Sequence, residues 1–102
     1  MTIDTSDIRV VNNPERKRFE VNVGKYTAVA EYIHLKTGII FTHTEVPAQL
    51  EGNGIGSMLA KTGLEYAKAN SLEVTPLCPY IAGYIKKHPE YLPLVKKGFN
   101  IR

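Results

Sequence analysis

Three side chains of this sequence are candidates for chemistry beyond packing: His43, Cys78 and Tyr84. His43 and Glu45 stand two residues apart before a glycine-rich stretch, so they could act as a general base and its orienting acid. A surface pair without a role explains the same spacing. Cys78 precedes Pro79, a favoured first residue of a helix, and a thiol at a helix N-terminus is favoured as the thiolate. The alternative for Cys78 is a small apolar side chain of the core.

Tyr84 belongs to a tyrosine-rich apolar face in the helix predicted over residues 79–87. Most stripes of this kind pack into a core. A phenol one turn into the helix that follows Cys78 could instead donate a proton to a reacting sulfur. Both interpretations of Tyr84 therefore stay open.

Glycines at alternate positions, Gly52, Gly54 and Gly56, open the longest predicted helix. They allow positive φ and close approach of a ligand to the backbone. The first amides of a helix have no partner within it and lie at its positive end, which makes such a turn a natural phosphate site. The spacing fits neither the dinucleotide fingerprint nor the Walker loop. A tight strand-to-helix turn without a ligand is the alternative.

The elements that must position these residues follow from hydrophobic periodicity. Alternation predicts strands over residues 18–23, 26–35 and 39–46, and their short connections make them antiparallel. A helix over 54–70 and a strand over 72–78 then form a right-handed crossover, which makes that strand parallel to the third. Helices follow over 79–87 and from Pro89. The predicted fold class is α/β with a mixed sheet, whose ligands bind outside the carboxyl ends of the parallel strands.

Strict alternation also assigns faces on the strand over 39–46. It places His43 and Glu45 on the face of Ile39 and Phe41, and the following side chains on the other: Thr42, Thr44 and Val46.

The whole chain of 102 residues has the length of one domain, which we expect over residues 14–102 after a flexible arm over 1–13 with a short strand at 8–11. The net charge of +3 is spread out, which gives no nucleic-acid footprint. No apolar run is long enough for a membrane span, and the first residues lack a signal-peptide pattern. One cysteine excludes an internal disulfide and a cysteine-based zinc site, no other metal site is predicted, and the expected compartment is the cytoplasm.

Four blocks in order resemble the minimal, single-domain GNAT-like N-acetyltransferases over residues 18–95. The blocks are Thr42-His43-Thr44-Glu45-Val46-Pro47, Gln49-x-x-Gly52-x-Gly54-Ile55-Gly56, Pro76-Leu77-Cys78-Pro79-Tyr80 and His88-Pro89-Glu90-Tyr91. The resemblance implies acetyl-CoA in a cleft where two adjacent parallel strands splay apart, with the pyrophosphate on the amides of residues 50–56. It also implies that Glu45 and Val46 pair with the pantetheine arm, and that Cys78 and Tyr84 lie towards the thioester. The implied cofactor-binding residues are Glu45, Val46, Leu50, Glu51, Gly52, Asn53, Gly54, Ile55, Gly56, Ser57, Cys78, Tyr80 and Tyr84.

The resemblance implies an acetyl-CoA-dependent N-acetyltransferase that is a monomer or a weak homo-oligomer. Its amine acceptor is not identified by the sequence. His43, through a water molecule, is the candidate base, and Tyr84 or Cys78 the candidate proton donor; in a variant mechanism Cys78 itself is acetylated. A module that binds acyl-CoA without catalysis is the main alternative, and a small interaction domain the weaker one.

Overall fold

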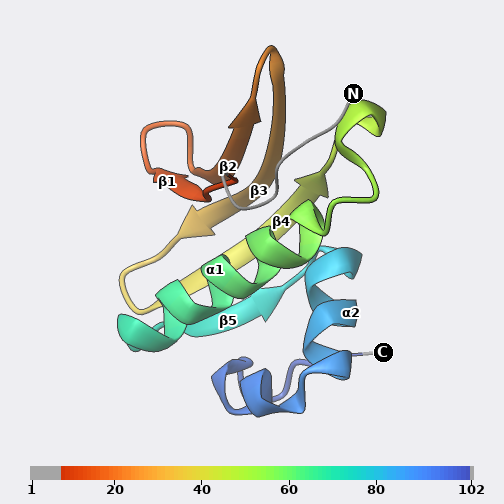
Figure 1. Ribbon diagram of the computed structural model, residues 1–102. Helices are drawn as coiled ribbons and strands as arrows, with labels where there is room; N and C mark the ends of the chain where they lie inside the picture. Colours follow the sequence, from red (N-terminus) through yellow and green to blue (C-terminus); the bar gives the residue numbers. More distant parts are fainter. Residues whose placement is uncertain (1–7, 102) are drawn as a thin grey trace.

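The computed structural model describes residues 8–101, and its centre is one five-stranded sheet in the order β1-β2-β3-β4-β5 (Figure 1). The strands β1 to β4 pair with one another in antiparallel fashion, and β5 is parallel to β4. The strands are β1 (Val11–Asn13), β2 (Arg18–Val23), β3 (Tyr26–His34), β4 (Gly38–Glu45) and β5 (Glu73–Pro76). The predicted mixed sheet is therefore confirmed.

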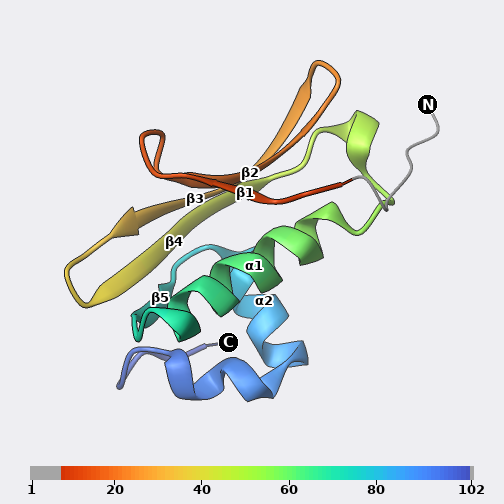
Figure 2. The same cartoon turned by 60° about the vertical axis from the view of Figure 1, so that its left-hand side comes forward.

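The helices form a second layer on one side of this sheet (Figure 2). The long helix α1 connects β4 to β5 as the predicted crossover, and α2 follows β5 directly. A 3₁₀ segment stands where we predicted the last helix, and another precedes α1. The helical elements are η2 (Ala48–Leu50), α1 (Ile55–Ala69), α2 (Pro79–Lys87) and η3 (Pro89–Leu94).

One continuous core lies between the two layers, because β2, β3 and β4 each turn alternate apolar residues towards α1. The sheet contributes these buried side chains: Phe19, Val21, Ala28, Ala30, Tyr32, Ile39 and Phe41. The helices contribute these: Ile55, Leu59, Ala60, Leu64, Ala67, Ile81 and Ile85. The face of the sheet turned towards α1 is called the inner face below, and the opposite face the outer face.

A β-bulge interrupts the alternation of β4. Neighbouring residues of β3, Glu31 and Tyr32, lie opposite His43 and Phe41, so Thr42 is an extra residue in β4. The Thr42 hydroxyl donates a 3.3 Å hydrogen bond to the Glu31 carbonyl. An inserted residue reverses the faces of everything that follows it in the strand.

The faces predicted for the end of β4 are therefore wrong. Thr44 lies opposite the buried Ala30 and continues the inner face, whereas His43 lies opposite Glu31 and Glu45 opposite Val29 on the outer face. Strict alternation treats Thr42 as a regular strand residue, so it assigns Thr44 to the outer face and His43 and Glu45 to the inner face.

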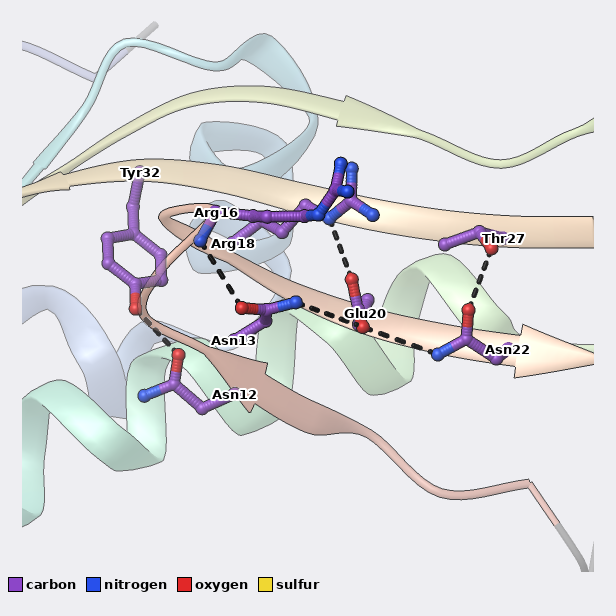
Figure 3. Close-up of polar contacts among 8 residues, drawn as sticks. All are labelled: Asn12, Asn13, Arg16, Arg18, Glu20, Asn22, Thr27 and Tyr32. Carbon is purple, nitrogen blue, oxygen red and sulfur yellow. Dashed lines mark hydrogen bonds and ion pairs between the residues drawn. The ribbon is translucent and has the colours of Figure 1, made fainter.

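The described part of the predicted N-terminal arm belongs to the domain. Val11–Asn13 form β1 at the edge of the sheet, which begins three residues later and ends two residues later than the strand expected at 8–11, and Ile8 is buried. Residues 1–7 of that arm lie outside the described residues. Two side chains attach β1 to its neighbours: Asn12 accepts a 2.6 Å hydrogen bond from Tyr32, and Asn13 donates one of 3.4 Å to Glu20 (Figure 3).

Glu20 is the centre of a polar network on the outer face (Figure 3). The Arg18 guanidinium donates to its carboxylate at 2.7 Å, and the Asn22 amide donates at 3.4 Å. The bond from Arg18 holds the pKa of Glu20 below its ordinary value. The network thus joins the side chains of β1 and β2 across the outer face.

Gly63 in the middle of α1 is expected to be required for close packing. A Cβ there would lie 2.9 Å from the ring of Phe41, which is fully buried. Gly63→Ala gains about 1 kcal/mol of helix propensity but overpacks the core at a cost of about 1–3 kcal/mol. We expect net destabilisation in urea unfolding.

Gly83 in α2 is the matched control, because a Cβ there would meet nothing within 4 Å. Gly83→Ala is expected to stabilise the protein by about 0.5–1 kcal/mol. If both substitutions stabilise, the contact of Gly63 with Phe41 does not constrain the core.

Candidate functional site

The glycine-rich loop connects the end of β4 to α1 by a tight turn. Gly52 and Gly54 have positive φ angles of 83° and 71°, which a side chain would strain. The side-chain amide of Asn53 donates hydrogen bonds to the backbone carbonyls of Leu50 and Glu51 at 3.0 and 3.2 Å. The loop is thereby closed on itself, with Glu51, Gly52 and Gly54 exposed and Leu50 buried.

The N-terminus of α1 leaves its first amides unpaired within the helix. The N–H of Met58 donates to the Gly54 carbonyl at 3.1 Å and makes the first bond of the helix. The N–H groups of Ile55, Gly56 and Ser57 therefore have no acceptor in the helix. Gly54 supplies no capping side chain, and the first turn carries no acidic residue. This positive helix end is suited to an anion.

A pocket of about 370 Å³ lies at this helix end. Its wall combines the inner face of β4, the glycine-rich loop, the first residues of α1 and one side chain of α2. The lining residues are Thr44, Val46, Leu50, Glu51, Gly52, Gly54, Ile55, Gly56 and Tyr80. All except Thr44 are among the residues expected to contact the cofactor. Asn53 and Ser57 lie in the same loop and first turn, although they do not line the pocket.

The strands β4 and β5 part beside this pocket. Their pairing ends at Phe41 and Pro76, and the Cys78 N–H makes a last bond of 2.9 Å to the Phe41 carbonyl. β4 continues to Glu45 without β5 beside it. The parallel pair therefore opens at the carboxyl ends, as the resemblance implied.

Backbone groups of β4 point into this opening. The Tyr32 N–H bonds the Lys17 carbonyl, so Tyr32 and Ala30, two residues apart, turn their backbone groups towards β2. Thr44 lies opposite Ala30. Its N–H and C=O therefore point away from β3, to the side that β5 has left. A ligand chain there can pair with Thr44 as an added strand would.

Cys78 is the N-cap of α2, with Pro79 in the first turn, as the sequence predicted. Its side chain is 2% exposed and does not line the pocket. The Cys78 Sγ lies 3.2 Å from Oγ1 of Thr44, which does line it. The thiol therefore lies outside the pocket lining but in contact with Thr44.

His43 and Glu45 are paired, but on the outer face. The His43 Nε2 lies 3.3 Å from a Glu45 carboxylate oxygen, and their side chains are 55% and 68% exposed. Neither residue lines the pocket. The structure thus brings the two together, as predicted, and separates them from the face on which Cys78 packs.

Tyr84 lies away from the pocket and stacks on His88, with 4.1 Å between the ring centroids. Burial raises its pKa, which makes the phenol a weaker acid. The neighbouring Tyr91 donates a 2.6 Å hydrogen bond to Glu65 of α1 and thus fixes η3 to that helix. These contacts explain Tyr84 as a packing residue.

The tyrosine that reaches the pocket is Tyr80, one turn earlier in α2. Its hydroxyl lies 3.4 Å from the Ser57 hydroxyl. A Cβ added to Gly56 would come within 2.6 Å of the same oxygen. Gly56 therefore leaves room for the Tyr80 ring over the first turn of α1.

Thr44 is the residue of this site that sequence reasoning missed. The local hint is that threonines stand on both sides of His43. The second of them, Thr44, faces inwards because a bulge at Thr42 precedes it. Nothing in the alternation of apolar residues marks that bulge.

A family model described as GCN5-related N-acetyl-transferase matches residues 18–94 of the chain. No curated protein matches the chain. Between residues 8 and 101, no group of three or more His, Cys, Asp or Glu side chains is arranged to hold a metal ion. Over the same part of the chain, no helix combines the length and the apolar character that a membrane span requires.

Proposed function

The chain belongs to the GCN5-related N-acetyltransferase family, and from this premise we propose that it binds acetyl-CoA and transfers the acetyl group to an amine. The observation that carries the proposal is the pocket at the start of α1, where the glycine-rich loop, unpaired helix amides and the opening between β4 and β5 meet.

The residues of this pocket fit the parts of acetyl-CoA by their chemistry. The pyrophosphate is an anion, and the free N–H groups of Ile55, Gly56 and Ser57 are donors at a positive helix end. Glu51 is the acidic residue of the lining, so we expect its backbone rather than its carboxylate to face the phosphates. The pantetheine arm carries amides, which suit the N–H and C=O of Thr44 that point away from β3.

The chain's own groups divide the chemistry between two faces of β4. Acetyl-CoA, when bound, supplies an activated acetyl group as a thioester. Cys78, whose sulfur lies 3.2 Å from the pocket residue Thr44, is the proposed donor of a proton to the departing CoA thiolate. In the variant mechanism its thiolate takes the acetyl group from the thioester, and CoA leaves with the proton. His43, on the outer face, serves as a base only for an amine that approaches from that side. Tyr84 has no part in this proposal.

The test is acetyl transfer to a panel of amines: peptide N-termini, lysine peptides, polyamines and small metabolites. Release of free CoA thiol and the mass of each acceptor are followed together. Transfer to one class supports the proposal and names the acceptor. Saturable binding of acetyl-CoA without transfer to any amine would instead support the binding module, and absence of binding would contradict both.

A further inference from the structure

We propose that Thr44 is a positioning residue, whose hydroxyl fixes the Cys78 thiol beside the pocket. The predicted effect of Thr44 on turnover rests on the proposed function. The contact itself can be tested without acetyl-CoA, so the two can fail separately.

The first support is the direction of the side chain. The bulge at Thr42 turns Thr44 from the outer to the inner face, so the strand departs from regular pleating two residues before this contact. Bulges often redirect a side chain next to a functional site. The same bulge turns His43 outwards, which leaves Thr44 as the polar side chain of this strand end that lines the pocket.

The second support is the enclosure of the thiol. The Cys78 backbone is fixed from both sides, since its N–H bonds Phe41 and its carbonyl accepts the Ala82 N–H at 3.0 Å. Its side chain is 2% exposed, and its sulfur lies 3.2 Å from the Thr44 hydroxyl. Among residues 8–101, the side chain that forms a hydrogen bond with this sulfur is Thr44.

Together these contacts hold the sulfur against a residue that lines the pocket. A hydroxyl can donate to a thiolate or accept from a thiol, so it can follow either protonation state of Cys78 without moving. A side chain of the same shape without a hydroxyl would leave the sulfur in place but unbonded. Thr44→Val is that change, and Thr44→Ser keeps the hydroxyl while removing the methyl group.

The experiment compares wild type, Thr44→Val and Thr44→Ser. In each protein the Cβ chemical shift of Cys78 is measured without ligand, followed by kcat and the KM for acetyl-CoA. We expect Thr44→Val to change the Cys78 shift and to lower kcat about 10- to 100-fold, the loss expected for a hydrogen bond to a charged group. The KM should stay within about twofold, and Thr44→Ser should recover most of kcat and the wild-type shift.

A double-mutant cycle completes the test. In a Cys78→Ala background, Thr44→Val should add little, because the two residues act as a unit. An unchanged Cys78 shift in Thr44→Val, equal losses in the valine and serine variants, or a full valine effect without Cys78 would overturn the proposal. If the wild type transfers no acetyl group, the proposed function fails, and the Cys78 shift still decides the contact.

Discussion

Replacing Ser57 by aspartate is expected to weaken acetyl-CoA binding about 10- to 100-fold while leaving the fold at least as stable as before. Ser57 is exposed in the first turn of α1, which has no acidic residue of its own. A carboxylate there interacts favourably with the helix dipole, which typically stabilises by about 0.3–1 kcal/mol. The same carboxylate repels a bound pyrophosphate within a few ångströms, at a cost of about 1–3 kcal/mol near a solvated surface.

The opposite signs of these two effects make the experiment specific. Binding is measured by calorimetry, and stability by urea unfolding of the free protein. Ser57→Asn is the matched control, because it has a similar size and no charge, and it should bind within a few-fold of wild type. Equal affinities of the aspartate and wild-type proteins would contradict a phosphate site at this helix end.

Replacing Cys78 by alanine is expected to lower kcat about 10²- to 10⁴-fold, the usual range for loss of a positioned acid or base. The fold should tolerate the change, because the side chain is small and the helix cap depends on the backbone. Calorimetry should show acetyl-CoA binding close to wild type, since Cys78 does not line the pocket. Wild-type turnover by Cys78→Ala would remove the thiol from the mechanism.

The two proposed roles of Cys78 can be separated by mass spectrometry. If the thiol is the nucleophile, mixing with acetyl-CoA in the absence of an amine should leave an acetyl group on Cys78. If it is the proton donor, the peptide containing Cys78 should keep its unmodified mass under the same conditions. The outcome decides between an acetylated enzyme and direct transfer.

The order of elements could be predicted because each has a strong local signal. The alternation around Phe19 and Ala30 marks β2 and β3, and the glycine pair at 52 and 54 marks the start of α1. Pro79 marks the start of α2 and with it the cap position of Cys78. Most of the pocket lining is local in sequence, because it comes from the glycine-rich loop together with the strand end before it, and Tyr80 of α2 is added by packing.

The site beyond the loop depends on tertiary geometry that no local pattern contains. Alternation cannot show that β3 and β4 pair with one residue extra at Thr42, so Thr44 and His43 were assigned to the wrong faces. Helical spacing places Tyr84 in the second turn of α2, but it does not give the rotation that stacks the ring on His88. Register and rotation come from packing between elements.

The most direct test of the central claim is a titration of labelled protein with acetyl-CoA, followed through the backbone amide shifts. We predict saturable shifts over residues 50–57 together with Thr44 and residues 78–80, because these line the pocket or border it. Gly83 and the β1–β2 turn should stay unchanged. Absence of shifts at millimolar acetyl-CoA, or shifts centred away from the start of α1, would contradict the account.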